Sequence, residues 1–540
     1  MLQYTFVRYL SSETCFGLSA GRSYATYYSI RLLNSRRSFL LEITGYKVAT
    51  EKLRLIASRI KYIYMLVYMV CFSMFNNAYL HAYYYNETQL MYQGLIFFGL
   101  ALLVFDFFTF SVMLKTKYSV MLVLFYVACM ASVIFNLKYD PVSNVKVIAW
   151  MLIQTFVFAA VDRTLPREHH KKYFKLVSEA VAIVWVSLSA WSISMFFSGY
   201  YAYLVNAEVF AGYARVGFVD GRLFGAFTDP NFASVCILFS MAMILSDMFM
   251  TKQSLPEKIY HIVILVIDYT YILLSRSRTA ELALIVVMAV IGFFASKHLL
   301  EKRGLSVLCK IAVMIVSAAV CAYGTSVIST TLNSAADTVY IALHEEDDMT
   351  DEEKKQLEEE TKRSDVEETD DVTNNRSTIW TDYLKVFLEN PFIGTGPRNG
   401  LAYANEHMPD SYIVEMQYQY HNGYLAVLVG TGVIGFLLVM LYIVLVAKKV
   451  IVYLWTKSGE YGKDYISVLM LCTVLVVGAI SALPLHILFF NNSASDAMFW
   501  FVLGYVLYMV CDGEQRKSSR LVRLTDVFRA KIFKETNTEQ

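Results

Sequence analysis

Long apolar stretches recur along the chain and predict a bundle of membrane-spanning helices. A span of the hydrocarbon core needs about 20 mostly apolar residues. Twelve stretches meet or approach this requirement, at 62–80, 91–113, 118–136, 146–162, 176–200, 229–250, 259–275, 280–297, 306–328, 423–447, 465–490 and 496–511. We therefore predict an all-α, polytopic transmembrane bundle of about 12 spans, with one long hydrophilic loop between spans nine and ten.

The polar stretches divide the chain into regions of different charge. A basic leader at 1–61 holds ten Lys and Arg residues, and the acidic insert at 345–371 holds fifteen acidic residues against four basic ones. The insert is typical of a solvated helix or a disordered segment. The predicted regions are the leader 1–61, spans one to nine at 62–328, the loop 329–422, spans ten to twelve at 423–511 and a basic tail at 512–540.

The distribution of Lys and Arg predicts which loops face the cytoplasm. Cytoplasmic loops are enriched in both residues, and here they alternate with nearly bare loops over all the predicted spans. The alternation places both termini in the cytoplasm and the long loop outside the membrane. No cleavable signal peptide is visible, because the first apolar stretch begins at residue 62. The leader either lies on anionic lipid or results from a mis-assigned start codon.

The composition agrees with a membrane protein and excludes other classes. Hydrophobic residues make up 56% of the 540 positions and charged residues 17%, against about 25% charged in a soluble domain. Disordered, collagen-like and disulfide-stapled chains are excluded on the same ground. Seven of the eight cysteines lie in or beside apolar stretches, so no disulfide framework is predicted.

Several cations break the charge rule because they fall on the predicted outer side, close to span ends. They are Arg215, Arg222, Arg276, Arg278, Arg376, Arg398 and His421. A single outer arginine can extend to lipid phosphate. Several at one membrane depth favour an anion site instead, because guanidinium groups bind phosphate oxygens in a bidentate fork and stay charged.

Four charged residues fall inside the predicted spans. Lys310 and Glu281 lie near span ends, whereas Asp106 and Glu179 are deeper. A charge at the bilayer centre costs about 2.5–3.5 kcal/mol on insertion scales. We therefore expect Asp106 and Glu179 to face the bundle interior, either as structural polar contacts or as the lining of a cavity.

Motifs for nucleotide or metal chemistry are missing from the sequence. No Gly-rich phosphate loop, HExxH motif or paired CxxC occurs. The first outer loop, 81–90, has Glu87 as its one acid. We therefore expect a mechanism without a metal or cofactor, in which arginines neutralise any diphosphate.

Three sequence segments in spans six to ten resemble the O-antigen ligase and O-antigen or capsule polymerase superfamily. The segment RLFGAFTDPN at 222–231 is similar to the family pattern R-x-x-G-x-F-x-x-P-N, and LLSRSRTAELAL at 273–284 to its Ser-Arg turn. The outer loop is similar in RSTIW at 376–380, in ENPFIGTGPRNG at 389–400 and in the ligase motif from HN at 421–422 to GVIG at 432–435. The acidic insert and the long leader depart from the family pattern. The positions of structural interest are Gly225, Pro230, Asn231, Trp380, Gly394, Gly396, Gly432 and Gly435.

The resemblance implies glycosyl transfer outside the inner membrane, from an undecaprenyl-diphosphate-linked sugar to an acceptor hydroxyl. On this reading Arg278 and Arg376 bind the diphosphate and His421 acts as general base or orients the acceptor. Arg222, Arg276, Arg215, Arg398 and Asn422 would bind diphosphate or glycan. Asn422 would hold the imidazole or the helix start, and Pro230 and Asn231 would shape the start of span six, with the Asn231 amide as a cap.

Three functions remain open at the level of sequence. A polymerase joins lipid-linked repeat units, whereas a ligase transfers the glycan to a lipid or protein acceptor. A twelve-span transporter or flippase is the third, although its halves usually flank a central cytoplasmic loop. We expect a bacterial inner-membrane enzyme that binds a lipid-linked donor, an acceptor and membrane lipid, and that binds no nucleic acid. Its expected protein partners are a flippase and a chain-length regulator.

Overall fold

The computed structural model describes residues 50–206, 213–301, 303–346, 349–363, 375–458 and 463–511. Most of the predicted basic leader, the basic tail at 512–540 and residues 347–348 and 364–371 of the acidic insert therefore lie outside the described residues. The chain divides into two compact units, Met1–Ile60 and Lys61–Gln540. All the features below belong to the second unit, apart from the first part of the helix Thr50–Met74.

The predicted helical membrane architecture is confirmed. Among the described residues, 10 helices are long and apolar enough to cross a membrane. They are Thr50–Met74, α4 (Tyr85–Thr109), α7 (Pro141–Ile153) with its π-helical continuation to Phe158, α8 (Arg167–Phe197), α9 (Pro230–Met250), α10 (Leu255–Ser275), α11 (Arg278–Leu300), α12 (Val307–His344), α18 (Gly423–Thr456) and α19 (Lys463–Ser481).

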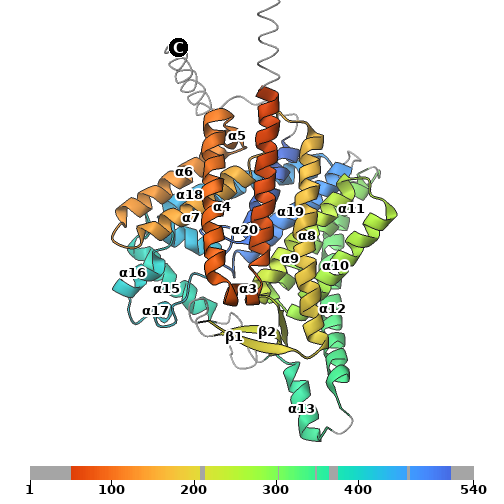
Figure 1. Ribbon diagram of the computed structural model, residues 1–540. Coiled ribbons are helices and arrows are strands. Elements are labelled where there is room, and N and C mark those ends of the chain that lie inside the picture. Colours follow the sequence, from red (N-terminus) through yellow and green to blue (C-terminus); the bar gives the residue numbers. More distant parts are fainter. Residues whose placement is uncertain are drawn as a thin grey trace, which may run out of the picture. The chain divides into compact units, whose positions relative to one another are not determined.

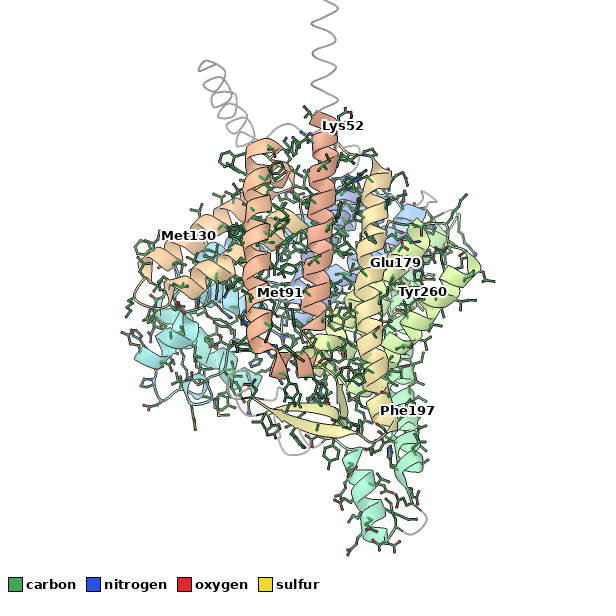
Figure 2. The ribbon with its side chains drawn as sticks, in the orientation of Figure 1. Lys52, Met91, Met130, Glu179, Phe197 and Tyr260 are labelled. Atoms are coloured by element: carbon green, nitrogen blue, oxygen red, sulfur yellow. The ribbon has the colours of Figure 1, made fainter. Side chains whose placement is uncertain are left out.

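Two shorter apolar helices, α6 (Ser119–Phe135) and α20 (Ala494–Val510), correspond to predicted spans three and twelve. Almost every residue of α20 is buried within the protein. Apolar side chains on the outside of the bundle, among them Met130, Phe197 and Tyr260, are exposed as a lipid-facing surface requires (Figure 2). The short helices between spans include α3 (Ala78–Tyr83) and α5 (Val112–Lys115).

Helix α12 is longer than the sequence analysis predicted. Its 38 residues run to His344, so the loop predicted to begin at 329 starts with a helical extension. A helix of this length spans about 57 Å, nearly twice the hydrocarbon thickness of about 30 Å. The acidic insert then forms α13 (Asp351–Glu360), whose first turn is closed by a capping box between Thr350 and Glu353.

One end of the bundle carries the irregular structure, at the bottom of Figure 1. A small antiparallel sheet of β1 (Tyr201–Val205), β2 (Tyr213–Val219) and β3 (Arg222–Gly225) lies there in the order β1-β2-β3, with Tyr201 opposite Gly217. The helices α15 (Arg376–Glu389), α16 (Gly400–His407) and α17 (Tyr412–Glu415) lie at the same end (Figure 1). The sequence analysis did not predict the sheet.

Candidate functional site

Residues of the sequence motifs lie at four helix N-termini. Asp229 caps α9 by accepting from the Asn231 amide at 2.7 Å, and Ser277 caps α11, whose first residue is Arg278. Arg376 is the first residue of α15. His421 directly precedes Asn422, which caps α18 by accepting from the Leu425 amide at 2.9 Å.

These ends of α9, α11, α15 and α18 lie close enough for their charges to interact. Burial lowers the pKa of His421, the Arg376 guanidinium lowers it further, and Asp229 opposes both. Burial also lowers the pKa of Arg376, where Asp229 again raises it and Arg278 lowers it. We call Asp229, Arg278, Arg376 and His421 the motif cluster.

The motif cluster has the physical properties of an anion site. A helix N-terminus presents unpaired amide donors and the positive end of the helix dipole, so phosphate groups bind there readily. Two guanidinium groups strengthen that field. His421 has a left-handed backbone with φ 44°, a conformation that is rare for non-glycine residues and concentrates at functional sites.

Asp229 is a site residue that the sequence analysis did not single out. Its carboxylate is exposed and interacts electrostatically with both Arg376 and His421. An Asp that precedes Pro at the start of an apolar stretch is an N-cap signal, so its place in the chain could have been anticipated. The structure also corrects the proposed cap of α9, which is Asp229 and not Asn231.

Arg222 is buried and links elements that position the motif cluster. Its Nε donates to the Ser275 carbonyl at 3.1 Å and its terminal nitrogen donates to Asn231 Oδ1 at 2.9 Å. Arg222 thereby joins strand β3 to the end of α10 and the start of α9. Pro230 is buried in the first turn of α9.

Two other predicted arginines are engaged in ion pairs. Arg276 pairs with Asp337 on α12 and donates to the Thr361 carbonyl at the end of α13, at 2.5 Å. Arg215 on β2 pairs with Asp220 at 2.9 Å. Arg276 therefore fixes the acidic insert beside the turn that carries Arg278.

The outer loop is inserted into a break in α18. Gly432 interrupts this helix with φ 63° and ψ −171°. The carbonyls released there accept from the loop, with Thr395 N bonded to Val429 O and Gly396 N to Gly430 O, each at 3.0 Å. In the opposite direction, the Val433 amide of the helix donates a hydrogen bond to the Pro391 carbonyl of the loop at 2.8 Å. The PFIGTG segment and the ligase motif are thus a single structural unit.

Gly432 and Gly394 are required where the loop and the helix meet. A Cβ on Gly432 would lie 2.3 Å from the carbonyl carbon of Phe392, and one on Gly394 would lie 2.5 Å from the Gly432 nitrogen. Both contacts are to backbone, so no side-chain rotation relieves them. The other motif glycines also contact neighbouring residues: Gly225 lies against Ser192, Gly396 against Asn399 and Gly435 against Thr431. The remaining motif residue is Trp380, whose buried indole N–H has no hydrogen-bond partner within the described part of the chain.

Arg398 lies in a separate cleft of about 330 Å³. Its backbone amide donates to Asn144 Oδ1 at 2.9 Å. The cleft is lined by aromatic, amide and cationic groups, including Tyr92, Trp150, Gln93, Lys146, Asn491 and Asn492. Burial lowers the pKa of His486 to about 3, and the charges of Arg398 and His421 contribute to this shift. His486 is therefore neutral.

An apolar cleft of about 400 Å³ lies among α11, α18, α19 and α20. It reaches Tyr424, three residues after His421, and continues along Tyr442 and Val446 of α18. Helices α11 and α18 both begin at the motif cluster, so the cleft lies along helices that lead away from it.

Comparison with protein families supports the sequence resemblance. Residues 262–440 match the family described as O-antigen ligase. This range contains Arg278, Arg376, His421 and the break at Gly432. The match confirms the resemblance to the O-antigen ligase and polymerase superfamily and associates this part of the chain with membrane glycosyl transfer, which involves a lipid-linked glycan and an acceptor. A comparison with curated proteins finds no match.

Proposed function

We propose that the protein polymerises undecaprenyl-diphosphate-linked oligosaccharide repeat units into an O-antigen, capsular or exopolysaccharide. The observation that carries this proposal is the motif cluster, where two arginines and a histidine meet at four helix N-termini. A diphosphate leaving group gains charge as the glycosidic bond breaks. Cations fixed in advance around that charge are usually the largest catalytic contribution.

The proposed reaction assigns a separate task to each side chain of the motif cluster. Arg278 and Arg376 bind the diphosphate. His421 takes the proton of the acceptor hydroxyl, whose oxygen bonds to the anomeric carbon as the bond from that carbon to the diphosphate breaks. Attack on the face opposite the diphosphate inverts the anomeric centre. The Asp229 carboxylate stabilises the imidazolium that forms, through its charge.

The two clefts suit the two ends of such a donor. The apolar cleft along α18 suits a prenyl chain, because its lining is almost entirely hydrocarbon. The cleft at Arg398 suits a glycan, since aromatic faces and amide groups recognise sugar rings and hydroxyls. Arg222, Arg276 and Arg215 act indirectly in this proposal, because each is held by a partner within the protein.

A ligase is the second candidate, and the O-antigen ligase family match favours it. Polymerase and ligase share the donor chemistry and differ in the acceptor. For either enzyme we place the active site on the extracytoplasmic side of a bacterial inner membrane, with both termini cytoplasmic. A flippase would supply the donor, and a chain-length regulator would act on the product.

Complementation distinguishes the two candidates. The gene and the glycan cluster that supplies its substrate are expressed in a polymerase-deficient and in a ligase-deficient strain. A polymerase restores long glycan ladders, whereas Arg278→Ala, Arg376→Ala and His421→Ala leave single repeats on the lipid carrier. If ladders form without the protein and reach their final acceptor only with it, the protein is a ligase. If all three variants act like wild type at equal expression, the motif cluster is not the active site.

A further inference from the structure

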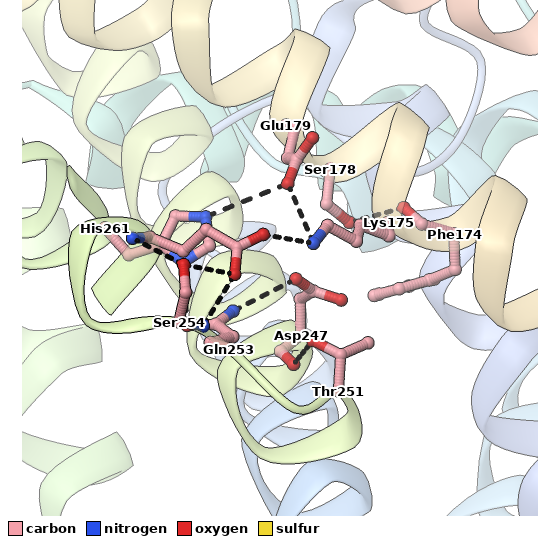
Figure 3. A network of polar contacts seen from close by, with 10 residues as sticks. Phe174, Lys175, Ser178, Glu179, Asp247, Thr251, Gln253, Ser254 and His261 are labelled. Atoms are coloured by element: carbon pink, nitrogen blue, oxygen red, sulfur yellow. Dashed lines mark hydrogen bonds and ion pairs between the residues drawn. The ribbon is translucent and has the colours of Figure 1, made fainter. Parts of the chain in front are cut away.

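A second polar cluster lies between α8, α9 and α10. It is near the C-terminal end of α9 and the N-terminal end of α10, whereas the motif cluster lies at the opposite ends of these two helices. The second polar cluster contains Glu179 on α8, Asp247 on α9 and His261 on α10 (Figure 3). One ligand atom from each lies within 4.8 Å of the others. Asp247 is 17 residues along α9 from its first residue, which corresponds to about 26 Å of helix. This cluster is therefore separate from the motif cluster.

Two buried atoms of this cluster lack hydrogen-bond partners. Asp247 and His261 are each only 1% exposed. Asp247 Oδ1 and His261 Nε2 have no hydrogen-bond partner among the described residues. Buried polar atoms are almost always paired, and leaving one unpaired costs about 1–3 kcal/mol. Nε2 points toward the Glu179 carboxylate, whose Oε1 lies 4.0 Å away.

The neighbouring amide fixes which histidine nitrogen carries the proton. Gln253 donates from its amide nitrogen to Asp247 Oδ2 at 3.3 Å, so its oxygen faces His261 Nδ1 at 3.1 Å. An amide oxygen only accepts, so Nδ1 holds the proton, and in the neutral imidazole Nε2 presents a lone pair. That lone pair faces carboxylate oxygens, which are also acceptors. A cation between them removes this conflict.

The charges of the cluster also call for a cation. Glu179, Asp247 and Glu257 supply three carboxylates, and Lys175 supplies one ammonium. Lys175 Nζ lies 3.5 Å from Glu179 and 3.4 Å from Glu257, longer than charge-assisted hydrogen bonds of about 2.7–2.9 Å. Within this group of four side chains the carboxylates outnumber the ammonium, which favours a bound cation.

We propose that Glu179, Asp247 and His261 bind a divalent transition-metal ion, with zinc the best match. Imidazole nitrogen and carboxylate oxygen are both zinc ligands, with bond lengths of about 2.0–2.2 Å, and a site with three protein ligands leaves a fourth position for water. Closing the three atoms onto such an ion takes side-chain movements of about 1 Å. Gln253 holds the His261 ring as an outer partner.

Such an ion would clamp three helices together. The opposite end of α9 begins at Asp229, and α10 ends at the turn that leads to Arg278. The ion therefore stabilises the helices that position the motif cluster, without taking part in glycosyl transfer. The site is independent of the proposed function, because it rests on different residues.

Metal binding by the full-length protein tests this inference. The protein is purified in lipid nanodiscs, stripped with a chelator and titrated with Zn²⁺ alone, and bound metal is measured by competition with a zinc indicator and by mass spectrometry. We expect one saturable site that is lost in His261→Ala and at least ten-fold weaker in Asp247→Asn. Gln253→Ala should weaken it about 10- to 100-fold, as loss of an outer partner typically does.

Glu168→Gln is the matched control, because it removes an exposed carboxylate from the same helix. It should bind zinc like wild type, and so should His421→Ala. Zn²⁺ should raise the thermal unfolding temperature of wild type, and Co²⁺ in its place should give visible d–d absorption. Wild type that takes up no zinc, or ligand variants that bind it unchanged, would overturn the proposal. If the ligand variants do not fold, the wild-type thermal shift and cobalt spectrum decide.

Discussion

At the scale of single residues, the account depends on the protonation of His421. Its pKa lies below the ordinary value because of burial first and Arg376 second, whereas Asp229 raises it. A general base must be neutral, so His421 is already competent below neutral pH. Activity should therefore rise with pH through the His421 pKa, with a midpoint below the ordinary histidine pKa of about 6.5.

The acid limb of the pH profile is the range in which activity rises with pH. Two substitutions that change the charge beside His421 should move this limb in opposite directions. Arg376→Gln removes a neighbouring positive charge, so the His421 pKa and the midpoint of the limb should rise. Asp229→Asn removes the carboxylate but keeps a good N-cap residue, so the midpoint should fall. Initial transfer rates measured against pH, or NMR titration of His421, would check both shifts. Limbs that stay at the wild-type pH in both variants would contradict the assignment.

Arg376 should be far more important for transfer than Lys385, the other cation on its helix. Removing a preorganised charge from an active site typically costs about 10²- to 10³-fold in rate. We expect such a loss for Arg376→Ala and a partial one for Arg376→Lys, because an ammonium cannot form the bidentate contact. Lys385→Ala is the control, since Lys385 lies on the same α15, is exposed and pairs with Asp382. Equal losses in the Arg376 and Lys385 variants would indicate a general effect on the outer loop.

The sequence could identify cations but not their partners. The breach of the charge-sorting rule singled out Arg278 and Arg376 together with Arg222 and Arg276. The latter two donate to Ser275 and to Thr361, which are 53 and 85 residues away in sequence. Such contacts arise only when the chain folds, and no local pattern carries them.

At the scale of elements, the structure explains why two distant glycine motifs occur together. The loop at 391–396 replaces the hydrogen bonds that α18 loses at Gly432. Each motif therefore depends on the other. The sequence showed the glycines and a turn, but it gave no indication that the turn would enter a membrane helix.

Gly432→Ala should destabilise the protein and disturb the loop at 391–396, which follows the helix that begins with Arg376. The left-handed φ and the backbone contact at 2.3 Å act together, so we expect a loss of more than about 1 kcal/mol in the free energy of unfolding. Gly324→Ala is the matched control in α12, where a Cβ meets no atom within 4 Å. It should be neutral or stabilise the helix by up to about 1 kcal/mol. Thermal unfolding in detergent compares the two, and equal stability would refute the inserted-loop arrangement.

The predicted spans were located well and their ends were not. Apolar length identifies a span, but α12 continues past residue 328, where Tyr340 and Asp337 find partners on other elements. The strands β1–β3 escaped prediction because each is at most seven residues long and all three lie in the short segment between two strong apolar stretches.

At the scale of the whole molecule, sidedness is the prediction that places the site outside the cell. Cysteine labelling would check it in a background without native cysteines. Asp410→Cys should react with a membrane-impermeant maleimide on intact cells, because it lies exposed between α16 and α17. Lys252→Cys, exposed between α9 and α10, should react only after permeabilisation. The reverse pattern would place the motif cluster in the cytoplasm and exclude the proposed donor.

The central claim is that the protein, through its motif cluster and without another enzyme, makes polymer from lipid-linked repeat units. The most direct measurement incubates purified protein in nanodiscs with one undecaprenyl-diphosphate-linked repeat unit as sole sugar substrate and follows product length by gel electrophoresis. We predict a ladder of two or more repeats from wild type and from Lys385→Ala, and unreacted single repeats from His421→Ala. A wild-type protein that extends nothing until another lipid or protein acceptor is added, or a His421→Ala variant that makes the same ladder, would contradict the account.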